Sequence, residues 1–153
     1  RLHDGAERRE VRILAIVVTD ALVRRARAVD ADLAAVERSE IRVANKRPVQ
    51  NHIKGVHAAA MSLLAETATG MVVGMNVRDD CLPLCKSLQV NFRKRATGGL
   101  TAKAHLTDAQ RASMASDTKG EVRVAVTVTD EAGIEPIECD FVWAWVPKEK
   151  PQA

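Results

Sequence analysis

Three residues of types that do chemistry follow one another in the segment of residues 51–66. Asn51 is followed six residues later by His57, and Glu66 comes nine residues further on, inside the small and apolar run AAAMSLLAETATG. A carboxylate held away from water costs on the order of several kcal/mol unless it is paired or hydrogen-bonded. Glu66 is therefore either at a surface or kept for chemistry. Each residue alone has a structural interpretation as a turn former, a helix cap or a satisfied core residue, so it is their order that favours a site.

The element that must position them is a helix. Residues Val56 to Val73 contain no Pro, one internal Gly and many good helix formers, and Gly74 is a suitable C-terminal stop. At ~1.5 Å per residue this helix is nearly long enough to cross a membrane. Small residues dominate it, however, and Glu66 lies mid-segment. These features favour a helix wrapped by its own sheet over a membrane span.

The segments around this helix alternate between apolar and polar residues, which predicts strands. One strand is expected over about residues 39–47, in SEIRVANKRP, and four more in LCKSLQVNFRKRA, LTAKAHLT, EVRVAVTVTD and PIECDFVWAWVP. DEAG has the composition of a hairpin turn, and DAQRASMASDTKG predicts a short helix or a loop. Residues 7–38 contain neither Pro nor Gly and predict one or two helices, although ILAIVV suits a strand equally well.

These elements predict one domain over residues 1–153 of the α+β class, with an antiparallel sheet wrapped around one long central helix. Residues 1–38 form an N-terminal helical extension in this interpretation, and residues 39–147 form the core. A chain of 153 residues with 46% hydrophobic residues can bury such a core.

Composition excludes several classes of function. The net charge is only +3, and the chain has no Tyr, two Phe and two Trp, so we expect no nucleic-acid partner. The apolar part of residues 11–23 is too short for a membrane span and lacks a signal-peptide cleavage pattern. The odd number of cysteines, three, favours free thiols in a reducing compartment, so we expect a cytoplasmic protein.

Familiar catalytic motifs are absent: the sequence has no GxSxG, HExxH, GxxxxGK[ST] or GxGxxG. Cys81 and Cys85, with His52, His57 or His105, are conceivable as a metal site or a thiol nucleophile. Free cysteine is more often a small buried hydrophobe, so we expect no metal and no cofactor.

The order Asn51, HAA at residues 57–59 and LAE at residues 64–66 resembles the motif of hotdog-fold acyl-CoA thioesterases of the phenylacetate-pathway and hydroxybenzoyl-CoA type. Their motif runs roughly N/Q, then HGG, then LAE or LVD at the same spacings. FRKRATGGLTAKAHL and VTVTDEAGIEPIECDFVWAWVPK resemble the family's strand pair and last hairpin. The likeness covers about residues 39–147 and is closest to a poorly characterised thioesterase-like branch.

The resemblance implies an acyl-CoA thioesterase with a CoA thioester as its substrate. The unpaired N–H groups of His57, Ala58 and Ala59 at the helix start would donate to the thioester oxygen, because the helix dipole favours negative charge there. The side-chain amide of Asn51 would donate a hydrogen bond to the same carbonyl oxygen or orient the nucleophilic water. Glu66, whose pKa an apolar wall should raise, would be a general base or a nucleophile.

Three positions differ from the family. Ala58 and Ala59 replace two glycines, which keeps both amides but adds methyls where the ligand approaches. Gly70 stands where some members carry a hydroxyl that holds the water. Thr67 and Thr69 point elsewhere on the helix, and Ser87 is a candidate substitute from the next strand.

Helical geometry also predicts a shared site. Glu66 lies ~13 Å along the helix from His57 and on nearly the opposite face, so one chain cannot bring both to one thioester. A homodimer or a dimer of dimers, with two equivalent sites in each two-fold dimer, would solve this.

Positive charge near the entrance would bind the coenzyme's phosphates. Arg93, Lys94, Arg95 and Lys103 are the candidates, although a solvated, charge-protected strand edge explains them at least as well. The alternative to an enzyme is a non-catalytic hotdog protein that binds acyl-CoA or a lipid-like ligand. A dehydratase is disfavoured because no Asp-x-Asn-Pro-x-His signature is present.

Overall fold

A computed structural model of the chain describes residues 10–13 and 36–149. In chain order the elements are β1 (Glu10–Ile13), β2 (Arg38–Val43), η1 (Arg47–Val49), α2 (Ala58–Gly74), β3 (Cys81–Phe92), β4 (Leu100–His105), α3 (Asp108–Ser116), β5 (Gly120–Asp130) and β6 (Ile137–Pro147). The strands form one sheet in the order β1-β2-β4-β5-β6-β3. All neighbours are antiparallel except β1 and β2, which are parallel.

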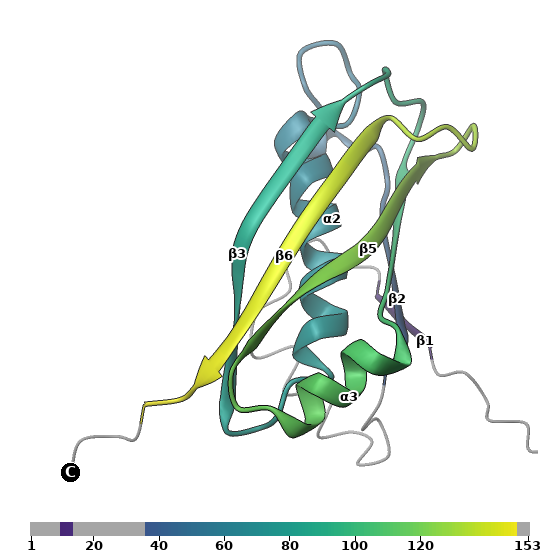
Figure 1. The fold of residues 1–153 in the computed structure, drawn as a ribbon. Helices are drawn as coiled ribbons and strands as arrows, with labels where there is room; N and C mark the ends of the chain where they lie inside the picture. Colours follow the sequence, from purple (N-terminus) through teal and green to yellow (C-terminus); the bar gives the residue numbers. More distant parts are fainter. Residues whose placement is uncertain (1–9, 14–35, 150–153) are drawn as a thin grey trace, which may run out of the picture.

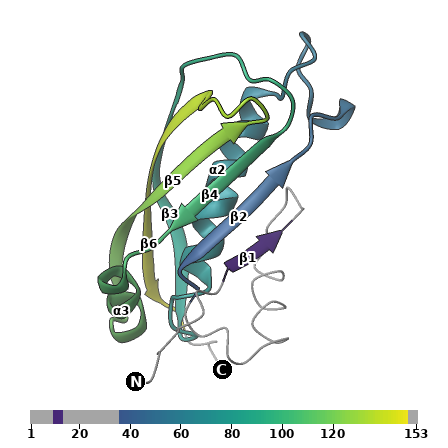
Figure 2. The same ribbon diagram turned by 90° about the vertical axis from the view of Figure 1, so that its right-hand side faces the viewer.

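The 17-residue helix α2 is the centre of the molecule and packs against one face of the sheet (Figures 1 and 2). Ten of its residues are buried, including Leu64, Met71 and Val72. Inward-facing side chains of the strands cover it, among them Ile41, Val128 and Phe141. The expected α+β arrangement of an antiparallel sheet around one long helix is confirmed.

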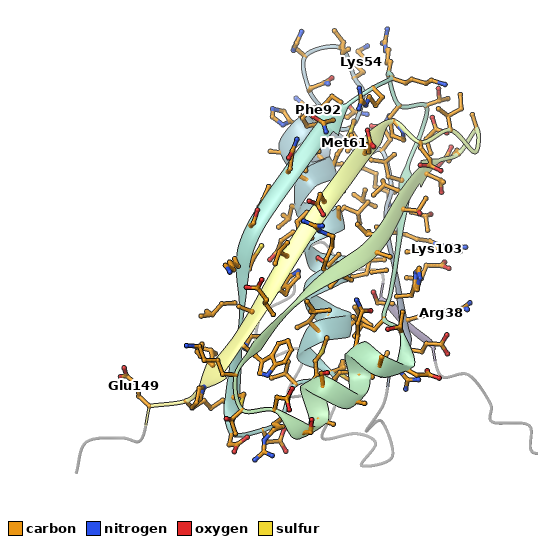
Figure 3. The ribbon with its side chains drawn as sticks, in the orientation of Figure 1. Arg38, Lys54, Met61, Phe92, Lys103 and Glu149 are labelled. Atoms are coloured by element: carbon orange, nitrogen blue, oxygen red, sulfur yellow. The ribbon has the colours of Figure 1, made fainter. Side chains whose placement is uncertain are left out.

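The order of the strands places β3 at one end of the sheet. β3 pairs with β6 along its whole length, apart from a bulge between Cys85 and Ser87. Within the described chain its other edge has no neighbouring strand. The start of α2 and the C-terminal end of β3 lie at the same end of the molecule, as the positions of Lys54, Met61 and Phe92 show (Figure 3).

Most predicted elements are present, with shifted ends. β2 ends at Val43, earlier than expected, and a 3-10 turn follows at Pro48. The loop after β5 is fixed by the Asp130 carboxylate, which accepts hydrogen bonds from the N–H groups of Thr97, Ala132 and Ile134. DAQRASMAS is the short helix α3, which starts with a capping box at Thr107.

The predicted N-terminal helices lie mostly outside the described residues. Glu10–Ile13 is a strand, so a helix over those four positions is wrong. The reason is that β1 pairs with residues 38–41 of β2. Backbone hydrogen bonds to this neighbouring strand outweigh the modest helix propensity of the four residues.

Candidate active site

Glu66 lies on the face of α2 that turns toward β3 and is half-buried. Burial raises the pKa of its carboxyl above the ordinary value. Its neighbour on β3 is Cys85: desolvation raises the pKa of the Cys85 thiol, and the negative charge of Glu66 raises it further. The two side chains are therefore close enough to interact across the gap between helix and strand.

Exposed apolar side chains lie on α2 beside this carboxylate and along the helix-facing side of β3. Leu63 is one turn before Glu66 on the same helix face, and it is 42% exposed. On β3, Leu88 and Phe92 are 53% and 54% exposed although they face the helix, because their cross-strand partners on β6 are the buried Phe141 and Ile137. We call this surface the open strip; it comprises Leu63, Glu66, Gly70, Cys85, Leu88 and Phe92.

The start of α2 presents fewer free amides than the sequence predicted. The N–H of His57 donates to Val49 O at 2.8 Å, and the N–H of Ala59 donates to the His57 Nδ1 at 3.1 Å. The first helical hydrogen bond is Met61 N–H to His57 O. Among the described residues, only the amides of Ala58 and Ala60 lack an acceptor there. Of the three predicted donors, the Ala59 amide is used by the cap and the His57 amide by Val49 O, and the Ala60 amide was not predicted.

Asn51 shapes the loop before the helix. Its Oδ1 accepts from the N–H groups of Ile53 and Gly55, both at 3.1 Å, and its own N–H donates to Gly55 O. The tight loop needs Lys54 at a positive φ of 61°. The side-chain NH₂ of Asn51 has no acceptor within residues 36–149 and remains available as a donor.

Trp143 occupies the space beside Gly70, the position at which some members of the resembled family carry a hydroxyl. A Cβ at Gly70 would lie 2.7 Å from Cη2 and 2.8 Å from Cζ2 of the indole. The indole Nε1–H donates to Thr69 Oγ1 at 2.9 Å, and the Thr69 hydroxyl donates to Glu66 O. Thr67 is buried. Glycine at position 70 is therefore required by packing.

Ser87 and Lys103 are not brought to this site. Ser87 pairs with Val142, which alternates with the buried Phe141 and Trp143, so it points to the sheet face away from α2. Lys103 lies on that outer face too, 3.5 Å from the Glu40 carboxylate and well away from Phe92 (Figure 3). The bulge in β3 turns Ser87 away from α2, and the strand order places β5 and β6 between β3 and the strand of Lys103.

The other three basic residues follow β3 directly. Arg93 is paired with Glu138, with Nε and an Nη at 3.0 and 2.5 Å from one carboxylate oxygen. Arg95 donates to Ile53 O at 3.4 Å, which joins this segment to the Asn51 loop. Lys94 is exposed. Arg93, Lys94 and Arg95 therefore adjoin the Phe92 end of the open strip and the loop before α2.

Other kinds of site find no support in the described residues. No group of His, Cys, Asp or Glu there is arranged to hold a metal ion, and the three cysteines are free. No helix in residues 36–149 is long and apolar enough to cross a membrane. A surface cavity of about 480 Å³ is lined by Arg38, Lys103, His105 and others, on the sheet face away from Glu66.

Comparisons with solved structures identify the fold. A Pseudomonas aeruginosa protein described as of unknown function and probable thioesterase matches with a TM-score of 0.66 and 19% identity, covering 86% of this chain and 97% of that one. A Bacillus halodurans protein solved with CoA matches with a TM-score of 0.57 and 18% identity, over 72% of this chain and 68% of that one. These likenesses show the hotdog fold of thioesterase-like proteins.

A Staphylococcus aureus thioesterase matches with a TM-score of 0.59 and 15% identity, covering 72% of this chain and 87% of that one. It was solved with a glutamine-to-alanine change at its position 32 and, separately, with a glutamate-to-alanine change at its position 47. No curated protein matches this chain. The family model described as Domain of unknown function (DUF4442) matches residues 24–146, and the chain belongs to that family.

Proposed function

We propose that this protein is an acyl-CoA thioesterase that hydrolyses a CoA thioester to a carboxylic acid and free CoA. The observation that carries the proposal is Glu66: a half-buried carboxyl with a raised pKa that opens onto exposed apolar side chains. A base that works near neutral pH needs a raised pKa, and a half-buried carboxyl that still reaches the surface can meet both a water and a substrate.

The chemistry divides between the carboxylate and the helix start. Glu66 takes a proton from a water whose oxygen attacks the thioester carbon. The carbonyl oxygen gains negative charge, which the Ala58 and Ala60 amides stabilise with the Asn51 side-chain NH₂. When the intermediate collapses, the C–S bond breaks and the CoA thiolate takes the proton from Glu66. Attack by Glu66 itself, through a mixed anhydride that water then cleaves, gives the same products.

One chain does not hold both halves of this site. Ala58 and Glu66 are eight residues apart on α2, so ~12 Å and more than two turns separate them. β3 offers the means of joining two chains, because it is a 12-residue end strand with exposed Leu82, Leu84, Leu88 and Phe92. Such an edge is a template for pairing with another strand. We propose a two-fold homodimer through β3, or a dimer of such dimers, with two shared sites.

The relatives support this choice of residues. The two positions changed in the Staphylococcus aureus thioesterase are 47 − 32 = 15 apart, and Glu66 and Asn51 are 66 − 51 = 15 apart. CoA is bound in the Bacillus halodurans structure. In this chain the CoA phosphates would meet Lys94 and Arg95, while Arg93 is shared with Glu138. Three free cysteines support a cytoplasmic location.

A second candidate is a non-catalytic protein that binds an acyl-CoA or a lipid-like ligand. Two observations favour it: the methyl groups of Ala58 and Ala59 stand at the helix start, and Trp143 fills the place of a water-holding hydroxyl beside Gly70. Ligand binding without turnover is the property that would distinguish it from the enzyme.

The decisive experiment is a thioester-cleavage assay with a panel of acyl-CoAs on the natural chain and on Glu66→Gln. We expect turnover by the natural chain and a loss of ~10²–10⁴-fold in kcat for the variant. Glu121→Gln, at an exposed carboxylate paired with Lys86, is the matched control and should keep full activity. Saturable binding of acyl-CoAs without turnover of any of them would contradict the thioesterase and favour the non-catalytic binding protein. Turnover unaffected by Glu66→Gln would contradict the assignment of Glu66 to the site.

The shared site has its own test. Chains carrying Glu66→Gln are mixed with chains carrying Asn51→Ala under conditions that exchange subunits. A mixed dimer has one intact site of two, so each mixed dimer should have half of the activity of a natural dimer. Subunit exchange without recovery would contradict a site built from two chains.

A further inference from the structure

The open strip has one closed end, and Trp143 closes it. Glu66 and Gly70 are successive turns on one face of α2, and Gly70 is in contact with the Trp143 indole. On the strand side, Trp143 pairs directly with Cys85, the neighbour of Glu66. Trp143 is 7% exposed, whereas Leu88 and Phe92 at the other end are more than half exposed. The strip therefore stops one helical turn beyond Glu66.

The indole is held firmly in that position. Its Nε1–H donates to Thr69 Oγ1 at 2.9 Å, and that hydroxyl is itself fixed by donating to Glu66 O. The ring lies where a Cβ at Gly70 would otherwise be, so it cannot approach the helix further. A ring anchored at its polar atom and packed on backbone is a rigid wall.

The order of groups along β3 gives the substrate a direction. From the basic segment Arg93–Arg95 the order along β3 is Phe92, Leu88 and then Cys85 beside Glu66. Trp143 lies opposite Cys85 on β6, with its ring against Gly70, one helical turn beyond Glu66. A CoA thioester with its phosphates at the basic segment would lay its pantetheine arm along Leu88 and Phe92. Its thioester would then lie at Glu66, and its acyl group would point at Trp143.

We propose that Trp143 limits the length of the acyl group, so that the protein takes short or compact acyl groups and excludes longer chains. This inference rests on the proposed function for its substrate class. Gly70 contributes to the same length limit, because only a residue without a side chain lets the Trp143 ring lie against the helix. Neither residue touches the reacting atoms; both determine specificity.

The test compares kcat/KM for acetyl-, butyryl-, hexanoyl-, octanoyl- and decanoyl-CoA in the natural chain and in Trp143→Leu. We expect the natural chain to favour the short members. In the variant, the ratio of octanoyl-CoA to butyryl-CoA should rise at least about tenfold, because one added methylene already changes such ratios by about that factor. Trp143→Phe, which retains a ring and is more conservative for folding, should shift the preference by a smaller step in the same direction.

Trp145→Leu is the matched control. This second indole lies two residues further along the same face of β6, packs on Gly120 and donates to Asp117 O, and has no contact with Gly70. Its loss should leave the ratio unchanged although it removes the same ring from the core. An equal shift in Trp145→Leu and Trp143→Leu would show a general loosening and would overturn the proposal.

Dissociation constants for the same acyl-CoAs separate this inference from the function on which it rests. If the natural chain binds short acyl-CoAs without cleaving them, and Trp143→Leu extends binding to octanoyl-CoA, the thioesterase proposal fails and the length limit stands. If the natural chain cleaves all lengths equally, the length limit fails and the thioesterase stands. Neither binding nor cleavage of any acyl-CoA would overturn both.

Discussion

The His57 Nδ1 accepts a hydrogen bond from the N–H of Ala59 at 3.1 Å, so the histidine of the HAA segment is the N-cap of α2. An imidazole in this role satisfies one of the amides that a helix start leaves unpaired. Because the cap uses the Ala59 amide and Val49 O uses the His57 amide, the donors left for a ligand belong to Ala58 and Ala60.

His57→Ala should therefore weaken the fold more than the chemistry. We expect the free energy of unfolding to fall by ~1 kcal/mol, the usual value of a side-chain cap, with kcat reduced only modestly. Urea denaturation measures the first quantity and thioester cleavage the second. His57→Asn should restore the cap, and His52→Ala, in the exposed loop, should change neither. A total loss of activity in a well-folded His57→Ala would show that the imidazole acts on the substrate.

Replacing Glu66 should make the fold more stable at neutral pH. Burial raises the folded-state pKa of Glu66 above 4.5, so the folded chain holds the proton more tightly than the unfolded chain does. Its contribution to stability is then fully present below pH 4.5 and is lost as the pH rises through the raised pKa. Glu66→Gln should raise Tm at neutral pH and leave it nearly unchanged in acid. A lower Tm at neutral pH would mean that the charged form is stabilised by the fold.

Gly70→Ala should destabilise the protein although alanine is the better helix former. Helix propensity favours alanine by ~1 kcal/mol, but the new Cβ would overlap an anchored indole at 2.7 Å, and overpacking costs about 1–3 kcal/mol. We expect a net loss of roughly 1 kcal/mol in chemical denaturation. Introducing Gly70→Ala into Trp143→Leu should instead be neutral or stabilising. Gly55→Ala is the control, because its Cβ would meet nothing nearer than 3.8 Å.

Cys85 should report on the charge of Glu66. It is the exposed cysteine; Cys81 is buried, and burial raises the pKa of Cys139 to about 11. Because Glu66 raises the pKa of the Cys85 thiol, Glu66→Gln should increase its rate of alkylation by iodoacetamide at a fixed, mildly alkaline pH. Mass spectrometry of the labelled peptide measures the rate. An unchanged rate would place the two side chains too far apart to interact.

Alkylation of Cys85 should also block the site. A carboxamidomethyl group on Cys85 would stand beside Glu66 in the open strip, so activity should fall in parallel with labelling. Cys85→Ser should be active and resistant to the reagent. Retained activity in the fully labelled protein would separate Cys85 from the path of the substrate.

The sequence by itself determined the elements that local patterns encode. The helix from Ala58 to Gly74 follows from a run of good helix formers without proline. The strands from Gly120 to Asp130 and from Ile137 to Pro147 follow from alternation, whose period of two fits one buried face. The position of Glu66 mid-helix, and its distance from the helix start, follow from helical geometry alone. The strand Glu10–Ile13 could not be predicted in this way, because its state depends on a neighbouring strand far along the chain.

Only the tertiary structure decided what surrounds Glu66 and what is free to act. Strand order placed β3 at the end of the sheet and so left Leu88 and Phe92 exposed along the open strip, while a bulge turned Ser87 to the other face. The His57 ring accepted the Ala59 amide, and Trp143, 73 residues after Gly70, packed against the position at which some members of the resembled family carry a hydroxyl. Such contacts join residues distant in sequence, and they depend on register, strand order and packing, which no local pattern records.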